Sequence, residues 1–156
     1  MFFFKKDKEE KIFSPIKGSV KPVTETPDQV FSQKIMGDGC CFDLADGLVV
    51  SPIDGEVTTI FETKHAIGLT SKKGSEIIIH IGMDTVSLGG EGFTALVKAG
   101  DKVKVGDPLI EVDIAKIKDK VPSMVTPLVV TNLGEKKIIL EKEGPVERGE
   151  HILTIN

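Results

Sequence analysis

Two of the three histidines in this chain, His65 and His80, lie within the segment 61–93. The β-branched residues of 75–81 predict a strand, in which successive side chains point to opposite faces. The odd-numbered isoleucines of this strand would face the core, so that His80 shares the other face with Ile78. We therefore expect the His80 imidazole on a rim or in a shallow depression, where it can meet a reactant.

The segment 58–70 reads as two strands joined by a turn, and this return of the chain would bring His65 close to His80. Residues able to orient imidazoles lie near both. Thr63 comes two residues before His65, and Asp84 comes four residues after His80. Two imidazoles that face each other, each with a polar neighbour, indicate a chemical site.

Four interpretations of the histidine pair remain open from this pattern. Both rings could be hydrogen-bonded structural groups at a strand edge. His65, His80 and Asp84 could bind zinc in a site of catalytic type. The pair could act as general acid and base in a pocket. One imidazole could accept a phosphoryl group while the other donates a hydrogen bond to its oxygens, and that reaction needs neither a P-loop nor a metal.

A zinc site of His65, His80 and Asp84 would loosely resemble the sites of the zinc peptidases that share a hybrid β fold. Those enzymes carry a His-x-His pair on one strand and a further His-x-x-x-Asp. Here the corresponding positions are Ile78 and Gly82, so the number of ligands falls short.

Length and composition exclude several classes of protein. A chain of 156 residues matches one domain of ordinary size with a single core. Its formal net charge is -4, Arg148 is the only arginine, and neither Trp nor Tyr is present. Arginine forks and aromatic stacking platforms are the usual means of reading nucleic acid, so we expect no nucleic-acid partner.

The cysteines and the apolar runs point to a reduced, cytoplasmic protein. Cys40 and Cys41 are neighbours, which cannot form an ordinary bridge with each other, and no apolar run approaches the length of a membrane span. We expect residues 1–11 to form a flexible N-terminal segment and 12–156 a single domain. An alternative role for Phe2–Phe4 with the adjacent lysines is contact with a membrane surface.

Turns and short strands dominate the rest of the chain. Asp-Gly pairs at 38–39, 46–47 and 54–55 are separated by short apolar runs, which predicts stacked hairpins. Helical periodicity is confined to 114–120, which Pro122 would end.

Two internal repeats suggest a duplicated architecture. Residues 14–20 (SPIKGSV) match residues 51–57 (SPIDGEV), and 100–112 are loosely echoed by 144–155. We therefore predict an all-β fold: an antiparallel β-sandwich or flattened barrel, a barrel-sandwich hybrid with duplicated halves and at most short helical turns. The phrases SPIDGEV (51–57) and AGDKVKVGDPLIEV (99–112) also resemble half of a biotinyl or lipoyl carrier domain. The modified-lysine motif of those carriers is missing.

Six phrases of the chain form a recognisable set: PDQVFSQKIMGDGC (27–40), SPIDGEV (51–57), IFETKHA (60–66), IIIHIGMDTVSLGGEGF (77–93), VKVGDPLIEVD (103–113) and TPLVVTN (126–132). Together they resemble the IIA domain of the glucose family of the bacterial phosphoenolpyruvate-dependent sugar phosphotransferase system. The resemblance extends over nearly the whole chain from about residue 12 onward.

The resemblance implies a phosphotransferase component in which a histidine carries the phosphoryl group. His80 would be the acceptor, His65 would stabilise the phosphoryl charge, Thr63 would hold His65 in the right tautomer, and Asp84 would be an acidic neighbour. No cofactor is implied beyond the covalent phosphohistidine, and no metal is required, although His65 and His80 remain conceivable zinc ligands.

The resemblance also implies partners. The donor would be the histidine phosphocarrier HPr and the acceptor a cysteine on the IIB domain of a glucose-type sugar permease, with transient docking of a monomer. Regulated transporters or kinases are further candidate partners. An apolar rim would shield the labile phosphorus–nitrogen bond. The candidate partner-binding residues are Phe31, Ile35, Phe61, Ile67 and Val86. Ile79 is a further candidate, but we expect it in the core.

One departure concerns the phrase after 126–132. Relatives often carry an acidic residue shortly after the Ser-Asn pair, whereas this chain has Gly134, with Glu135 adjacent and Asn132 retained. Two other classes of function stay as alternatives: a zinc-dependent hydrolase of the same β fold, and a regulatory binding module.

Overall fold

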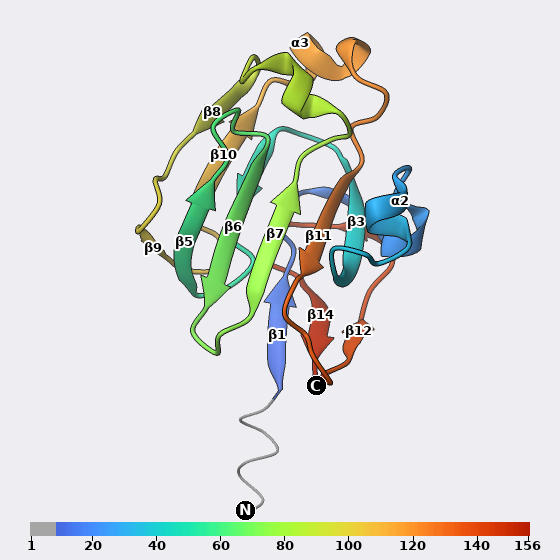
Figure 1. Ribbon diagram of the computed structural model, residues 1–156, viewed down its shortest axis with the longest axis vertical. Coiled ribbons are helices and arrows are strands. Elements are labelled where there is room, and N and C mark those ends of the chain that lie inside the picture. The colour runs from blue at the N-terminus through green and yellow to red at the C-terminus, as the bar shows by residue number, and fades with distance from the viewer. Residues whose placement is uncertain (1–8) are drawn as a thin grey trace, which may run out of the picture.

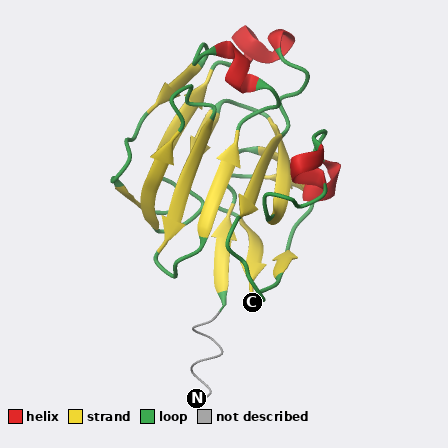
Figure 2. Ribbon diagram, viewed as in Figure 1, coloured by secondary structure: helices red, strands yellow, loops and turns green. Residues whose placement is uncertain are grey.

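Antiparallel strands are the main secondary structure of this protein, and only short helical segments lie at its edges (Figures 1 and 2). The structure, a computed structural model, describes residues 9–156. The strands that form the first structural half are β1 (Glu10–Phe13), β2 (Gly18–Pro22), β3 (Asp38–Leu44), β11 (Thr126–Val130), β12 (Ile138–Leu140), β13 (Gly144–Val146) and β14 (His151–Ile155). Those of the second half are β4 (Leu48–Val50), β5 (Gly55–Ile60), β6 (Ala66–Ser71), β7 (Glu76–His80), β8 (Phe93–Ala95), β9 (Lys102–Val103) and β10 (Pro108–Val112).

Strand pairing shows that these two sets are equivalent. An eight-stranded sheet runs in the order β13-β2-β3-β11-β7-β6-β5-β9, and two three-stranded sheets have the orders β1-β14-β12 and β4-β10-β8. Exchanging β2 with β5, β3 with β6, β11 with β7 and β13 with β9 reproduces the order of the large sheet. Exchanging β1 with β4, β14 with β10 and β12 with β8 converts one small sheet into the other. The second half is therefore inserted into the first, between β3 and β11, and the prediction of duplicated halves is confirmed.

The sequence repeat makes the same contacts in both halves. The Ser14 hydroxyl donates to the Ile16 carbonyl over 2.8 Å, and the Ser51 hydroxyl donates to the Ile53 carbonyl over 2.7 Å. Both serines are fully buried. A buried hydroxyl that closes its own turn explains why the serine stands at the start of each phrase.

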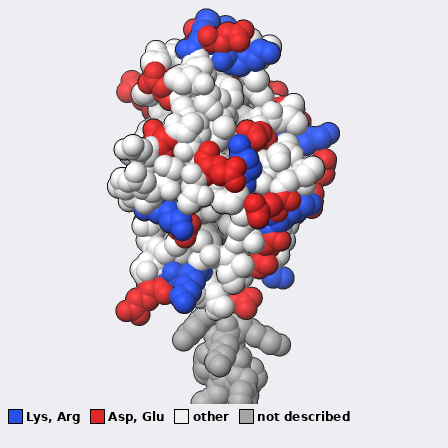
Figure 3. All heavy atoms as spheres, turned by 90° about the vertical axis from the view of Figure 1, so that its right-hand side faces the viewer, with Lys and Arg blue, Asp and Glu red and all other residues white. Residues whose placement is uncertain are grey.

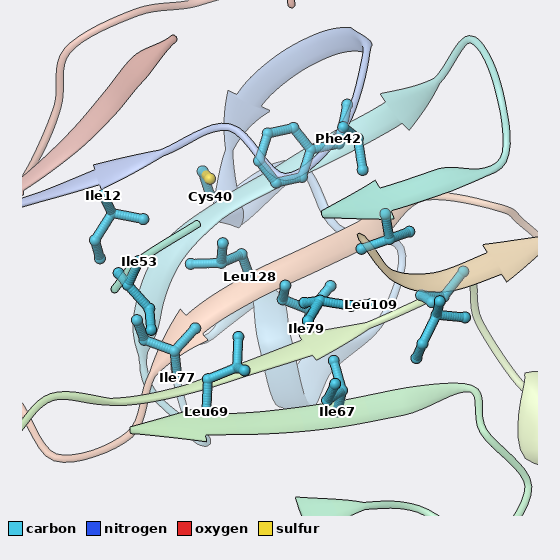
Figure 4. Close-up of a cluster of buried hydrophobic side chains, with 14 of the residues drawn as sticks. Ile12, Cys40, Phe42, Ile53, Ile67, Leu69, Ile77, Ile79, Leu109 and Leu128 are labelled. Carbon is cyan, nitrogen blue, oxygen red and sulfur yellow. The ribbon is translucent and has the colours of Figure 1, made fainter. Parts of the chain in front are cut away.

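The core lies between the large sheet and the two small ones. Isoleucine is its commonest residue. Ile79 of β7 and Leu128 of β11 are register partners where the two halves meet. Figure 4 shows buried side chains of both halves packed together, among them Ile12, Cys40, Phe42, Ile53, Ile67, Leu69, Ile77, Ile79, Leu109 and Leu128.

Helical segments are short, as predicted, but more of them occur than the sequence indicated. The amphipathic piece at 114–120 is confirmed as α3 (Ile114–Ile117) followed by η3 (Lys118–Lys120). The segments that sequence patterns missed are η1 (Val23–Glu25), α2 (Gln29–Ser32) and η2 (Thr85–Leu88). Each is too short to show a helical period.

The Asp-Gly pairs do not form stacked hairpins, so that prediction is wrong. β3, β4 and β5 pair with other strands and not with one another. Residues 38–39 lie inside β3, where a Cβ on Gly39 would stand 1.9 Å from the Leu128 carbonyl oxygen of β11. Glycine is needed there for a close approach of two backbones and not for a turn.

The N-terminal boundary also differs from the expected one. Glu10 and Lys11 pair with Ile155 and Thr154 as part of β1, although residues 1–11 were expected to be flexible. Phe2–Phe4, the proposed membrane contact, lie outside the described residues. Within 9–156, no helix is long and apolar enough to cross a membrane.

Candidate functional site

His80 ends β7 on the outer face of the large sheet, as predicted. The odd-numbered isoleucines Ile77, Ile79 and Ile81 are buried, whereas His80 and Ile78 are partly exposed. His80 Nδ1 lies 2.8 Å from the Gly82 carbonyl oxygen. Because a carbonyl can only accept, His80 Nδ1 carries the proton, and in the neutral ring Nε2 keeps a free lone pair.

His65 lies directly before β6 and faces His80. The ring centroids are 5.0 Å apart and the ring planes meet at 81°. Two backbone links hold this arrangement: Ala66 is the register partner of His80, and the Ile81 amide donates to the His65 carbonyl over 2.7 Å. The expectation that the return of the chain brings the two histidines together is confirmed.

Thr63 contacts His65 as the sequence suggested, with 2.6 Å between Oγ1 and Nδ1. Unlike a carbonyl, a hydroxyl can donate or accept. When Thr63 donates, His65 Nδ1 is the acceptor and Nε2 carries the proton. His65 is 4 % exposed, so its ring is nearly enclosed.

Burial keeps both imidazoles neutral near pH 7. It lowers the pKa of His80 below the ordinary value of 6.5, against a smaller opposite effect of the hydrogen bond to Gly82 and of the Asp28 carboxylate. Burial also lowers the pKa of His65, and the charge of a protonated His80 would lower it further. A neutral His80 with its lone pair on Nε2 is the form that can act as a nucleophile.

Two phenylalanines pack against the histidine pair. The Phe31 ring of α2 lies 5.3 Å from the His80 ring, and the Phe61 ring lies 5.6 Å from the His65 ring in an edge-on arrangement. Phe31 is 4 % exposed and Phe61 39 %. Phe31 therefore supports the site from within, so its assignment to the partner-binding rim is wrong, whereas Phe61 is part of the surface.

Comparison with known proteins agrees with this geometry. The family model for the phosphoenolpyruvate-dependent sugar phosphotransferase system, EIIA 1, matches residues 10–136. The solved structure of glucose permease IIA from Mycoplasma capricolum is 38 % identical in sequence, covers 99 % of this chain and 99 % of its own, and superposes with a TM-score of 0.91. The chain belongs to this EIIA family. It is a phosphocarrier of the sugar phosphotransferase system with an antiparallel β-sandwich fold.

The apolar rim of this IIA domain differs in part from the predicted one. Ile35, Phe61 and Val86 are exposed, as expected of partner-binding residues. Ile67 is fully buried in the core, so its assignment to the rim is wrong, because its side chain points to the inner face of β6. Ile79 is likewise core, as favoured.

Two exposed apolar residues on and after α2, the helix that carries Phe31, were not among the predicted rim residues. Val30 is 40 % exposed and Met36 38 % exposed. Their backbones meet at the end of α2, where the Met36 amide donates to the Val30 carbonyl. Helical periodicity could not reveal these residues, because α2 has only four residues and Met36 lies beyond its end. The Asp28 side chain caps it by accepting from the Val30 amide over 2.8 Å.

The acidic residues associated with the histidine pair in this IIA domain are Asp84 and Asp28. Asp84 precedes η2 in a left-handed conformation, with an exposed carboxylate that makes no hydrogen bond to either imidazole. Asp28 acts electrostatically on His80. The cue for Asp28 was its place at the start of the 27–40 phrase, where an aspartate before an apolar run is a helix cap.

The zinc alternative finds no support in the site. Among residues 9–156, no group of three or more His, Cys, Asp or Glu side chains is placed to hold a metal ion. The His65 and His80 rings stand together, but Asp84 does not complete a ligand set with them.

Gly134 follows Asn132, which contacts the start of β7, at the opposite end of that strand from His80. The Asn132 side chain accepts from the Glu76 amide and donates to the Gly74 carbonyl, and both of these residues lie at the start of β7 or just before it. Gly134 has a φ of 59°, a conformation that favours glycine. The backbone shape therefore explains this glycine without any change at the site.

Proposed function

We propose that His80 Nε2 accepts a phosphoryl group from HPr and passes it to a cysteine on the IIB domain of a glucose-type permease. The observation that carries this proposal is the hydrogen bond from His80 Nδ1 to the Gly82 carbonyl. It leaves Nε2 as the only ring nitrogen with a lone pair, on a side chain that is partly exposed at the outer face of the large sheet.

In the first transfer, the bond between phosphorus and the HPr histidine breaks as the bond to His80 Nε2 forms. The HPr ring recovers its lone pair, and the phosphorylated His80 ring keeps its proton on Nδ1. The positive charge of that ring is then shared with the Gly82 carbonyl. In the second transfer, the cysteine thiolate of IIB attacks phosphorus, and His80 Nε2 leaves with its lone pair.

His65 is the proposed stabiliser of the phosphoryl group. With Thr63 donating to its Nδ1, the Nε2–H of His65 is free to donate to a phosphoryl oxygen on the neighbouring ring. A donor already in place needs no reorganisation during transfer, and such preorganised donors are a major source of catalysis. Asp84 and Asp28 would set the local charge at this edge.

The exposed apolar residues around the pair are the proposed docking surface for both partners. They shield the phosphorus–nitrogen bond from water in the complex while leaving it open to an incoming nucleophile. The surface is formed by Val30, Ile35, Met36, Phe61 and Val86. Figure 3 shows acidic and basic groups interspersed on the face turned to the right in Figure 1, without an extended area of one sign.

Glucose is the proposed sugar class, because the similar solved structure is that of a glucose permease IIA. The IIA domain itself does not contact sugar in this scheme. We further propose that the protein acts as a monomer in the cytoplasm, needs no cofactor, and uses the same surface for any regulated transporter or kinase.

Intact-mass analysis tests the proposal most directly. The protein is incubated with phosphoenolpyruvate, enzyme I and HPr, and one added phosphate, lost in mild acid, is expected on His80. His80→Gln should abolish acceptance. His65→Gln should still accept phosphate but lose onward transfer to IIB, by at least about a hundredfold if His65 supplies a preorganised donor.

His151→Gln is the matched control, because His151 is the third histidine and is hydrogen-bonded on β14 away from the site. It should behave as the unaltered protein in both transfers. If the His80→Gln protein still carried acid-labile phosphate, the assignment of the acceptor would be contradicted. Equal loss of both transfers in His65→Gln would contradict the separate roles.

A further inference from the structure

The peptide group between Gly82 and Met83 is hydrogen-bonded at both ends. Its carbonyl oxygen accepts from His80 Nδ1 over 2.8 Å, and its amide, on Met83, donates to the Ser123 carbonyl over 2.9 Å. Ser123 belongs to the connection that leads into β11, in the other structural half. The atom that sets the His80 tautomer is thus oriented by a distant part of the chain.

The amide of Gly82 is held from the same direction. It donates to the Thr126 hydroxyl over 3.3 Å, and that hydroxyl in turn donates to the Met124 carbonyl over 3.0 Å. Thr126 is fully buried at the start of β11. Because its proton is used on Met124, the Thr126 oxygen presents a lone pair to Gly82.

Gly82 itself cannot be kept in place by a side chain. Its φ is 73°, and an added Cβ would stand 2.7 Å from Thr85 Cγ2 and 3.2 Å from the Ser123 carbonyl oxygen. The position therefore requires glycine, the residue with the greatest backbone freedom, at the point where the carbonyl must be aimed most narrowly. Neighbouring groups have to supply the missing rigidity.

We propose that Thr126 is a positioning residue for His80: its hydroxyl fixes the Gly82 backbone so that the Gly82 carbonyl holds His80 in the Nδ1–H tautomer. This inference rests on the proposed function, because the tautomer matters only if His80 Nε2 is the acceptor. Without the Thr126 hydroxyl, the 81–83 backbone can turn and the Nε2–H tautomer gains population. That tautomer places its lone pair on Nδ1, toward the backbone, where a phosphoryl donor cannot reach it.

The experiment reads the tautomer directly in the unphosphorylated protein. Long-range proton–nitrogen NMR correlations of ¹⁵N-histidine-labelled protein at pH 8 should show His80 with its proton on Nδ1. Thr126→Val keeps the shape of the side chain and removes the hydroxyl, so the Nε2–H signature should grow. Thr126→Ser restores the hydroxyl and should restore the original spectrum.

Phosphorylation by HPr gives the second readout. The initial rate of Thr126→Val should fall about two- to tenfold, the effect of one hydrogen bond of typical net strength, while the KM for HPr is unchanged. Thr131→Val is the matched control, because Thr131 follows the same strand and its hydroxyl contacts Glu76 instead. It should change neither tautomer nor rate.

A third measurement needs no substitution. Hydrogen exchange of the Gly82 amide in the unaltered protein should be slow, because the proposed bond protects it. Exchange as fast as in a free loop would overturn the proposal, and so would a Thr126→Val protein with the original tautomer and rate. Absence of any phosphate on the unaltered protein would instead refute the proposed function and leave the tautomer result intact.

Discussion

The two imidazoles differ in the group that holds Nδ1, and this difference suits their separate roles. His80 faces a backbone carbonyl, which only accepts, so its tautomer is fixed. His65 faces the Thr63 hydroxyl, which accepts as readily as it donates. His65 can therefore gain or lose a proton without losing its hydrogen bond, as a group that meets a variable phosphoryl charge must.

The lowered pKa values of both histidines predict how stability depends on pH. The unfolded chain takes up these two protons near pH 6.5, whereas the folded protein takes them up only at lower pH. Stability is therefore complete above pH 6.5 and declines as the pH falls below it. Urea unfolding at pH 7.5 and 5.5 should show this decline, and the double variant His65→Gln, His80→Gln should flatten it.

The carboxylates with lowered pKa values do not contribute to the difference in stability between these two pH values. The carboxylates whose pKa values are lowered, such as Asp46 beside Arg148, titrate in a more acidic range and hold their charge at both pH values. An equal decline in the double variant would show that the acid sensitivity comes from elsewhere, and the neutral character of the site would have to be reconsidered.

β3 and β6 flank the central β11–β7 pair, and each contains a glycine without a positive φ. These two glycines have opposite surroundings. A Cβ at Gly39 of β3 would stand 1.9 Å from the Leu128 carbonyl oxygen, whereas at Gly68 of β6 the nearest atom would be 3.5 Å away, on Thr59. At Gly39 two backbones approach each other closely, whereas at Gly68 there is room for a methyl group on the outer face of the sheet.

Gly39→Ala is therefore expected to destabilise the protein by about 3 kcal/mol or more, since β11 must move to admit the methyl group. Gly68→Ala should change the free energy of unfolding by less than about 1 kcal/mol, because its methyl group makes ordinary contacts. Chemical denaturation of the pair measures both. Equal effects would mean that glycine is needed in these strands for a reason other than the space around it.

The elements also show where sequence reasoning succeeded and where it could not. The alternation of 75–81 correctly placed His80 on the outer face, because a strand period depends only on local geometry. The Asp-Gly pair at 38–39 was misread as a turn, since glycine serves turns and close backbone approaches alike. Ile67 was assigned to the wrong face, and Val30 and Met36 were missed, because exposure depends on packing between distant segments.

The candidate site belongs to neither structural half alone. His65 and His80 come from the inserted half, while α2 with Phe31 and the Thr126 hydroxyl come from the half that surrounds it. The only arginine, Arg148, joins the halves as well, through a two-pronged contact with Asp46 at their junction. A phosphoryl site assembled in this way forms only when both halves are folded together.

The duplication leads to a prediction about stability. Ser14 and Ser51 occupy equivalent positions and make equivalent buried hydrogen bonds, to Ile16 and Ile53. Ser14→Ala and Ser51→Ala should each lower the free energy of unfolding by about 1–3 kcal/mol, because each leaves a buried backbone group without its partner. The two losses should agree within about 0.5 kcal/mol if the halves are energetically as well as geometrically alike.

Denaturation followed by two probes tests both the magnitude and the cooperativity. Ser87→Ala is the control, because this exposed hydroxyl contacts only the Asp84 carbonyl and water can replace it; its effect should stay below about 0.5 kcal/mol. Because the second half is inserted into the first and the two share one core across β7 and β11, a single transition is expected in every variant. A much larger loss for Ser51→Ala, with two separate transitions, would show that the inserted half can unfold by itself.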